Sequence, residues 1–360
     1  MAFLENGWYA AAWCDEMGPS PVGRTILSEP VVLFRDEQQR LKAVGGRCPH
    51  RFAPLAKGRL VGGALECPYH GLRFDGEGKC VFNPHGNRVV PAAAKVRSFP
   101  VVERHRLVWL WMGKDGEQNP SLIPDFGFVD HHDWATVTGS ISGQGHYELF
   151  SDNILDLGHA AFIHQQTVGA PSFLYGRRKM YRSGTTVHSN FFAQDDLLSP
   201  VLAKIFDKVN VRVDATVEVQ WTAPANLLLT HYVHDVGTSP SDEQCLRTFH
   251  VFTPETDEST HYFWAVSRKY RASDQALSNA IAEGFQATFE HEDKPMIATQ
   301  QELMGGREFW SLKPVLLQGD TAGVLARRLL EKAVADERIE KDDDGVARNR
   351  ARISNSFRRV

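Results

Sequence analysis

The sequence predicts an α+β protein in which an all-β N-terminal domain precedes a larger domain of antiparallel strands and helices. Three observations favour this fold class. Short apolar or alternating runs separated by turn signals fill residues 1–115. Longer strand-like runs and two helical segments follow in residues 116–330. At 360 residues the chain is also longer than a single core usually organises.

The strands expected in residues 1–115 are short and are bounded by tight turns. Pairs such as Gly45-Gly46 and Asp75-Gly76 lie between them and favour the backbone conformations that turns require. The expected strands are Val31–Phe34, Leu41–Val44, Ala64–Cys67, Leu72–Phe74 and Leu107–Trp111. This pattern is typical of a small all-β domain.

A linker rich in Asp-Gly and Asn-Pro pairs, Lys114–Asp125, leads into the second domain. Strands are expected there at Thr216–Trp221, Leu227–Val233, Leu246–Phe252 and His261–Val266. Helices are expected at Glu148–His164 and Ser273–Leu303, so one face of an antiparallel sheet should carry helices. Residues 331–360 are rich in charge and are predicted to form a C-terminal tail, as a solvated helix or a loose segment.

Charge and composition argue against several classes of partner. The net charge near −4 offers no general attraction for nucleic acid and predicts no basic membrane patch. The sequence shows no signal-peptide pattern and no apolar run long enough to span a bilayer. Its five cysteines form no disulfide framework of a small secreted protein, and Cys14, Cys80 and Cys245 are expected to be small buried residues. We therefore expect a cytoplasmic protein.

Two short motifs each combine one thiol with one imidazole: Cys48-Pro49-His50 and Cys67-Pro68-Tyr69-His70. Two Cys and two His can hold a tetrahedral zinc ion, which is the alternative here. However, zinc sites usually group the cysteines in one knuckle and the histidines in another. A [2Fe–2S] centre with two thiolates on one iron and two imidazoles on the other matches the mixed pairs better.

A second set of potential ligands lies in the helical segment that begins near Glu148. His159 and His164 are five residues apart, which places them about 140° apart on a regular helix. They can share a metal only if the helix widens or ends between them. Asp156, three residues before His159, is expected to accept a hydrogen bond from its ring. The two histidines would form the facial triad of non-haem iron(II) oxygenases together with a carboxylate from the segment Glu290-His291-Glu292-Asp293-Lys294. The alternative is that the two histidines are unrelated.

The motif pattern Cys-x-His…Cys-x-x-His resembles that of the Rieske iron–sulfur family. The resemblance implies one [2Fe–2S] cluster per chain, with Cys48 and Cys67 on one iron and His50 and His70 on the other. Histidine ligation raises the reduction potential, to roughly −150 to +300 mV, which suits an electron relay.

The later segments resemble the catalytic domain of Rieske oxygenases, whose helix motif reads Asn-x-x-Asp-x-x-His-x-x-x-x-His. That motif falls on Asn153, Asp156, His159 and His164. The family's Glu-Asp-Lys element implies that Asp293 is the third ligand of one mononuclear Fe(II), with Glu290 as the competing carboxylate. The implied fold of residues 116–330 is a helix-grip-like catalytic domain.

The resemblance covers essentially the whole chain and is closest to single-component oxygenases of the vanillate and dicamba O-demethylase type. It is strongest at Pro21–Leu27, Arg51–Leu55 and Thr253–Thr256. It implies a terminal monooxygenase that uses O₂ to O-demethylate, or to hydroxylate a methyl group of, a substituted aromatic acid. It also implies a homotrimer in which Asp156 bridges His70 of a neighbouring subunit to His159. Electrons would come from a separate flavin- or ferredoxin-type reductase, since no Gly-x-Gly-x-x-Gly fingerprint follows any expected strand.

Other activities stay open at this level. Aromatic-ring cis-dihydroxylation uses the same two metals, and a pure electron carrier or a lipid-binding module would use fewer of them. For the substrate pocket, strand alternation places Leu229 and His231 on one face of their strand, and His250 on one face of the next. His250 is expected to anchor an acidic substrate group, with Leu229 against the ring; a core histidine bonded to backbone is the alternative.

Overall fold

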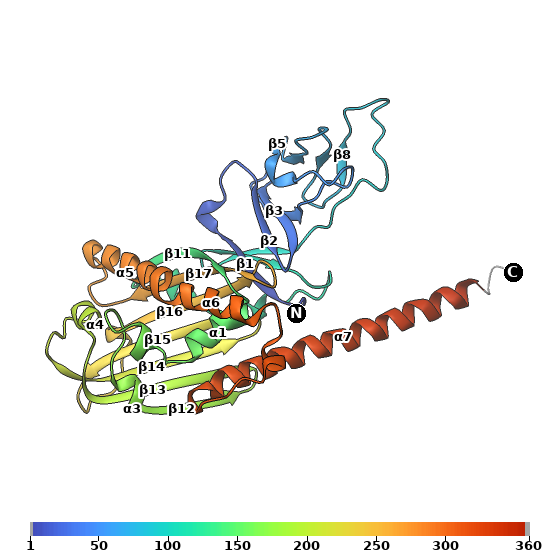
Figure 1. The fold of residues 1–360 in the computed structure, drawn as a ribbon. Helices are drawn as coiled ribbons and strands as arrows, with labels where there is room; N and C mark the ends of the chain where they lie inside the picture. Colours follow the sequence, from blue (N-terminus) through green and yellow to red (C-terminus); the bar gives the residue numbers. More distant parts are fainter. Residues whose placement is uncertain (1–2, 357–360) are drawn as a thin grey trace.

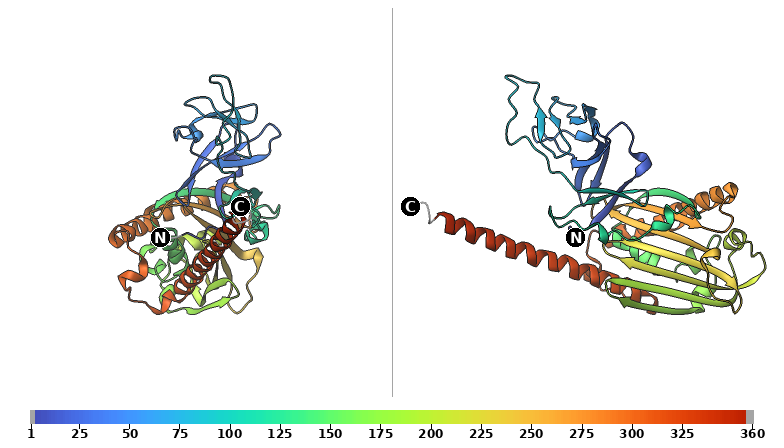
Figure 2. Two further views of the ribbon diagram at one scale, coloured as in Figure 1. Left: turned by 90° about the vertical axis from the view of Figure 1, so that its right-hand side faces the viewer. Right: turned by 180° about the vertical axis from the view of Figure 1, so that it is seen from behind.

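The computed structural model describes the backbone of residues 3–356 and the side chains of residues 3–340. An all-β N-terminal part lies at one end of a larger part built on a single wide sheet (Figure 1). The same separation is visible from two further directions (Figure 2). The predicted α+β fold class is confirmed.

Three small antiparallel sheets make up the N-terminal part, with the strand orders β1-β10-β9, β2-β3-β4 and β5-β6-β7-β8. The strands are β1 (Trp8–Trp13), β2 (Val22–Ile26), β3 (Glu29–Arg35), β4 (Leu41–Gly45), β5 (Arg59–Val61), β6 (Ala64–Glu66), β7 (Arg73–Phe74), β8 (Cys80–Phe82), β9 (Val101–Arg104) and β10 (Leu107–Trp111). The five strands expected from the sequence correspond to β3, β4, β6, β7 and β10.

A seven-stranded antiparallel sheet forms the centre of the larger part. In spatial order its strands are β11 (Ala135–Gln144), β17 (Ser259–Arg268), β16 (Cys245–Pro254), β15 (Asn226–Asp235), β14 (Arg212–Thr222), β13 (Thr186–Leu197) and β12 (Arg177–Ser183). Residues of β16 and β17 are buried almost without alternation because both faces of these strands are covered. The edge strand β12 instead alternates between exposed and half-buried residues.

One face of this sheet packs on the N-terminal part. Alternate residues of β10 belong to two different cores: Trp109 contacts the large sheet, whereas Val108 and Leu110 face the smaller sheets. Phe249 and Phe263 of the large sheet complete the shared core. A hydrogen bond from Thr253 Oγ1 to the Ala10 carbonyl (2.7 Å) also joins the two parts.

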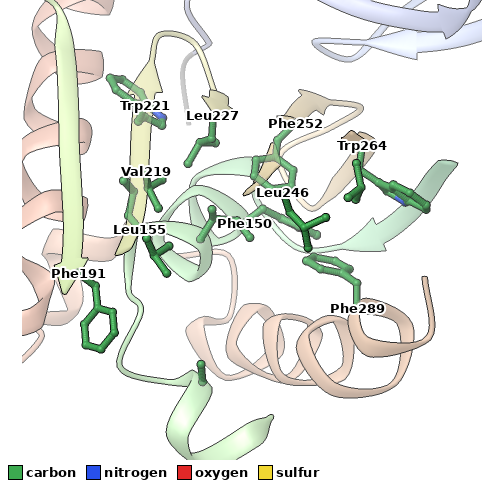
Figure 3. Packing of buried hydrophobic residues seen from close by; sticks show 14 of the residues in the cluster. Phe150, Leu155, Phe191, Val219, Trp221, Leu227, Leu246, Phe252, Trp264 and Phe289 are labelled. Atoms are coloured by element: carbon green, nitrogen blue, oxygen red, sulfur yellow. The ribbon is translucent and has the colours of Figure 1, made fainter. Parts of the chain in front are cut away.

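The opposite face of the sheet carries the helices, as predicted (Figure 1). They are α1 (Tyr147–Leu155), α2 (Ala160–Ile163), α3 (Ser172–Tyr175), α4 (Pro200–Ile205), α5 (Gln275–Thr288), α6 (Lys294–Met304) and α7 (Thr321–Ser356), with a π-helix at Phe289–Asp293 between α5 and α6. Phe150 of α1 and Phe289 of the π-helix pack against Leu246 and Phe252 of β16 in the main core (Figure 3). The helical segment predicted at Ser273–Leu303 is therefore present, with a π-helix inside it.

Helix α7 runs through the boundary predicted at residue 331 without a break. Ala322, Ala326 and Leu330 are buried, and the Glu337 carboxylate accepts hydrogen bonds from the backbone N–H groups of Glu5 (2.9 Å) and Asn6 (2.6 Å). The first half of the helix is therefore packed on the domain. For the remaining residues, a separate charged tail stays a prediction. The acidic run at 342–344 lies outside the described side chains. No helix among residues 3–356 is long and apolar enough to cross a membrane.

Candidate metal centres

The two cysteine–histidine loops have the same internal hydrogen bonds. In each, the cysteine N–H donates to the carbonyl five residues later, and the N–H four residues after the cysteine donates back to the cysteine carbonyl, at 2.8–3.0 Å. The residues that close these turns, Phe52 (φ 57°) and Gly71 (φ 70°), both adopt the left-handed conformation. Glycine adopts it without steric cost. One backbone design is therefore used twice to present a thiol and an imidazole.

The four predicted ligands of these loops lie together. Cys48 and Cys67 are only 1% and 2% exposed, and the ring centroids of His50 and His70 are 4.6 Å apart. Burial raises the pKa of the Cys48 thiol to about 11, and the thiol of Cys67 adds to the effect. The buried Nδ1 of His70 has no hydrogen-bond partner among the described residues. A pair of buried thiols and a pair of imidazoles from the same two loops, one imidazole with a nitrogen unpaired among the described residues, fit a centre that takes all four as ligands.

His159 and His164 also converge, but not on one continuous helix. The helix predicted at Glu148–His164 is wrong in this respect: α1 ends at Leu155, and Asp156 has an extended backbone (φ −87°, ψ 100°). The two histidines flank the single turn of α2 as its first and last caps. The helical conformation stops at His164 (φ −104°, ψ 24°), and the Nε2 atoms of the two histidines are 3.2 Å apart.

Asp293 completes the group from the end of the π-helix. Its Oδ1 lies 3.5 Å from His159 Nε2 and 3.3 Å from His164 Nε2, and it accepts a hydrogen bond from Asn153 Nδ2 at 2.8 Å. Burial alone would raise the pKa of Asp293, but the hydrogen bonds from the two histidines and Asn153 hold it well below its ordinary value. A π-helix inserts an extra residue into a helix and is frequent at functional sites. The competing carboxylate, Glu290, instead pairs with Lys294 Nζ at 2.7 Å.

The Asp156 carboxylate does not make the contact that the sequence predicts. His159 Nδ1 contacts the backbone carbonyl of Asp156, whereas the carboxylate Oδ2 is 3.8 Å away. The other carboxylate oxygen accepts a hydrogen bond from the Gly158 N–H at 2.8 Å. The expected bond is wrong because the turn at Asp156 brings the carbonyl, not the side chain, to the ring. The carboxylate is 36% exposed and can bind a group outside this subunit.

The three predicted pocket residues lie on the face of the sheet that carries the helices. Leu229 pairs with Thr248 across β15 and β16, and His231 pairs with Leu246. His250 is 3% exposed, its Nδ1 lies 2.7 Å from the Tyr262 hydroxyl, and its Nε2 has no partner among the described residues. The alternative of a core histidine bonded to backbone is therefore not what the structure shows.

The imidazoles of this face are neutral at ordinary pH. Burial lowers the pKa of His250 to about 3, against a smaller opposing effect of the Asp293 carboxylate. Burial also lowers the pKa of His231 to about 4, and its ring lies 5.8 Å from that of Phe206. His250 is linked to the segment of the triad through Tyr262, whose ring packs on Phe289 of the π-helix that ends at Asp293 (4.6 Å between centroids). His231 instead packs beside the end of α4.

Comparison with known families agrees with both centres. Residues 7–100 match the Rieske [2Fe-2S] domain, and residues 144–336 match the vanillate O-demethylase oxygenase C-terminal domain. The chain is a Rieske non-haem iron oxygenase. Its cofactors are a Rieske [2Fe–2S] cluster and a mononuclear non-haem iron, so the zinc alternative for the first centre is excluded.

Relatives of this Rieske oxygenase match it over almost their whole length. The oxygenase component of chloroacetanilide N-alkylformylase from Rhizorhabdus wittichii is 38% identical, and the match covers 93% of this chain and 97% of the relative. The oxygenase component of dicamba O-demethylase from Stenotrophomonas maltophilia is 36% identical, and the match covers 92% of this chain and 98% of the relative. The crystal structure of dicamba monooxygenase bound to 3,6-dichlorosalicylic acid superposes with a TM-score of 0.89 at 36% identity, covering 94% of this chain and 99% of that one.

Two residues around the iron site of this Rieske oxygenase were missed from the sequence. Glu292 accepts hydrogen bonds from His164 Nδ1 (2.5 Å) and from Thr167 Oγ1 (2.8 Å), so it fixes the orientation of the His164 ring. Its position next to Asp293 was the available signal. The Tyr262 hydroxyl, which contacts His250, gave no signal because the contact depends on the pairing of β16 with β17.

A buried arginine from α7 was also missed. Arg327 donates two hydrogen bonds to Asp152 Oδ2 (2.7 and 2.9 Å) and also contacts Glu148, with only 6% of its side chain exposed. Both carboxylates lie on α1, one turn apart, beside Asn153 and Asp156. Arg327 therefore ties the C-terminal helix to the helix that carries the outer residues of the iron site.

Proposed function

We propose that this chain is the terminal oxygenase of a multicomponent monooxygenase that O-demethylates, or hydroxylates a methyl group of, a substituted aromatic acid. The observation that carries the proposal is the facial arrangement of His159, His164 and Asp293 in a chain that also carries a Rieske domain. Three protein ligands on one side of an iron leave positions for both O₂ and substrate. The relatives named above are the oxygenase components of a chloroacetanilide N-alkylformylase and of a dicamba O-demethylase.

The reaction balance requires a separate electron donor. Inserting one atom of O₂ into a C–H bond releases the other as water and takes up two electrons and two protons. When bound, the cluster supplies the electrons one at a time, and the iron supplies the site at which O₂ is activated. On an aryl methyl ether the hydroxylated methyl group collapses to a phenol and formaldehyde. A flavin- or ferredoxin-type reductase is the proposed donor.

In this proposal each residue of the two centres has a separate task. Cys48, Cys67, His50 and His70 hold the cluster. His159, His164 and Asp293 hold the iron, while Asn153 steadies Asp293 through their 2.8 Å hydrogen bond. Burial opposes ionisation of the Asp293 carboxylate, but the hydrogen bonds from these donors outweigh it and lower the pKa, so the group stays ionised and available as a ligand.

We also propose that electrons pass between subunits of a trimer, from His70 of one subunit to Asp156 of the next. A hollow of about 520 Å³ lies outside the iron site, beside His159. Its carboxylates include Asp156 and Asp320, and its exposed apolar side chains include Phe162 (65% exposed), Val315 (87%) and Leu317 (72%). An acidic, apolar hollow is suited to a surface that carries positive charge and aromatic rings.

The exposed edge of the cluster loops has this complementary character. Arg51 and the imidazole of His50 are exposed next to His70, whose pKa is lowered by burial and further by these two neighbours. Phe52 and Tyr69 are 76% and 59% exposed next to them. The edge of one subunit and the hollow of another therefore match in charge and in apolar surface, which supports a head-to-tail ring.

Mixed trimers would test this route. Asp156→Asn subunits keep a cluster, and Cys48→Ser subunits keep Asp156 and the iron ligands. If electrons cross between subunits, a mixture refolded or co-expressed as hybrids should turn over although each variant alone does not. Inactive hybrids in which every subunit holds its mononuclear iron and the Asp156→Asn subunits hold their cluster would show that the route lies within one subunit.

For the activity itself, the test is turnover with a panel of methoxylated and methylated aromatic acids, O₂ and a generic reductase. The proposal predicts formaldehyde or a benzylic alcohol in step with reductant consumed. An Asp293→Ala variant should lose this activity, whereas Glu290→Ala should keep it. A cis-diol product would establish ring dihydroxylation instead, and electron uptake without any product would indicate an electron carrier.

We further propose that His250 anchors the acidic group of the substrate, with Leu229 and His231 as further residues of the same face. The support is the buried Nε2 of His250, which has no partner among the described residues, and the hydrogen bond of its ring to Tyr262, which packs on the π-helix of Asp293. His250→Phe should weaken the binding of acidic substrates by about 1.5–3 kcal/mol, the scale of a hydrogen bond to a charged group. A neutral analogue without an acceptor should bind as before. Equal losses for both compounds would indicate a folding role.

A further inference from the structure

His250 and Tyr262 form a buried hydrogen-bonded pair on the sheet face that carries the iron site. His250 lies on β16 and Tyr262 on the neighbouring β17, and Nδ1 is 2.7 Å from the hydroxyl oxygen. Their rings are close to parallel (9°), and neither residue is more than 3% exposed. Tyr262 packs on Phe289, the first residue of the π-helix that ends at Asp293, with 4.6 Å between the ring centroids. The pair therefore lies beside the helical segment that carries an iron ligand and away from water.

The hydrogen-bonding capacity of the pair determines which nitrogen carries the proton. A neutral imidazole has one N–H donor and one bare nitrogen acceptor. If Nδ1 carried the proton and donated to Tyr262, the tyrosine O–H and the bare Nε2 would both be unpaired, since no other partner of either lies among the described residues. If Tyr262 donates to Nδ1, only one group, the Nε2–H, is unpaired. Because each unpaired buried polar group is costly, the second arrangement is favoured.

We propose that Tyr262 is a positioning residue for substrate selection. By donating to Nδ1 it fixes His250 as the Nε2–H tautomer, so this subsite presents a single donor. The substrate group that faces it must then be an acceptor, such as a carboxylate or a carbonyl, and not an N–H or O–H donor. This inference rests on the proposed role of His250 as the substrate anchor.

The surroundings of His250 favour a substrate group over a trapped water molecule. Its ring lies 6.4 Å from that of Phe252 and 5.8 Å from that of Phe285. A buried water needs two to four polar partners, and aromatic rings provide none. An analogue that places an N–H against the Nε2–H would leave two donors unpaired. Sites of this kind discriminate strongly because the wrong ligand leaves buried groups without partners.

Tyr262→Phe tests the tautomer role because it removes only the hydroxyl. The phenyl ring keeps the packing on Phe252 (4.7 Å between centroids) and Phe289 (4.6 Å). The probes are 2-methoxyacetophenone, a carbonyl acceptor, and 2-methoxyaniline, an N–H donor, with Kd measured on the anaerobic holoenzyme. We expect wild type to prefer the acceptor, and the variant to lose about 3- to 10-fold of this preference, the range of one neutral hydrogen bond.

Tyr147→Phe is the matched control, since Tyr147 is also a buried tyrosine but its hydroxyl has no partner among the described residues. It should leave the ratio of the two Kd values unchanged. If His250→Phe does not weaken binding of the acceptor probe, His250 is not the substrate anchor, and the proposed tautomer role of Tyr262 is wrong as well. If His250→Phe abolishes the preference but Tyr262→Phe keeps it, only the tautomer role is wrong. The inference is also contradicted if the wild-type protein binds the two probes with equal Kd values or binds neither of them.

Discussion

Glu292→Gln should weaken binding of the mononuclear iron and leave the cluster intact. The Glu292 carboxylate accepts from His164 Nδ1 at 2.5 Å and from Thr167 Oγ1 at 2.8 Å. It therefore directs Nε2 of His164 toward Asp293 and increases the basicity of that nitrogen. Glutamine preserves the size of the side chain but not its charge. Partners of this kind are typically worth about 10- to 100-fold in metal affinity, which is about 1.4–2.8 kcal/mol.

The assay is an anaerobic Fe(II) titration of protein from which the mononuclear iron has been removed, with the cluster absorbance as an internal measure of folded protein. Glu290→Gln is the matched control, because Glu290 lies two residues earlier in the same π-helix and pairs with Lys294 instead. It should bind iron as wild type does. Equal affinities for the Glu292 variant and wild type would refute the reasoning. Loss of iron in the Glu290 variant would instead restore Glu290 as a ligand.

Three further predictions concern the cluster, the electron route and the C-terminal helix. His70→Cys should keep a cluster but lower its potential toward about −400 mV, as seen by voltammetry, because a thiolate replaces a neutral ligand; an unchanged potential would exclude His70 as a ligand. Asp156→Asn should retain both metals. In a single turnover, the reduced cluster of this variant should be reoxidised more slowly when substrate and O₂ are added. A wild-type rate of reoxidation would show that Asp156 is not on the electron route. Arg327→Met should destabilise the fold by about 3 kcal/mol, because it leaves two half-buried carboxylates without their cation. Burial raises the pKa of Glu148 to about 7 although Arg327 lowers it, so wild type loses the stability of the protonated form as the pH rises to 7. Without Arg327 the pKa rises further and the loss continues above pH 7, so the gap in Tm from wild type should widen there. The exposed Arg328→Met should show neither effect.

The parts of the molecule that could be predicted from the sequence depend on local chemistry. Each cluster loop is held by hydrogen bonds within six residues, so its ligands are adjacent in sequence as well as in space. The strands of both domains are recognisable because their apolar residues and flanking turns are local features. The two histidines of the triad could be predicted for a similar reason, since His159 and His164 lie within one short segment, whereas Asp293 was assigned only from the resemblance to the family's Glu-Asp-Lys element.

What could not be predicted depends on contacts distant in sequence. The break after Leu155 is not encoded by a proline, and the segment has helical character on both sides. A Cβ at Gly158 would meet Asp156 Oδ1 at 3.0 Å and the guanidinium of Arg178 at 3.3 Å, so the turn packs closely against β12. The attachment of α7 through Glu337 joins groups more than 330 residues apart in the chain. No local pattern reports such a contact.

The central claim, that one chain carries both a Rieske cluster and a mononuclear iron, is tested most directly by counting iron and acid-labile sulfide per chain in the purified protein. The account predicts about three irons and about two sulfides, with one iron lost and the sulfide unchanged in His164→Ala. About two irons and two sulfides in wild type, unaffected by that substitution, would contradict it and would leave only an electron carrier.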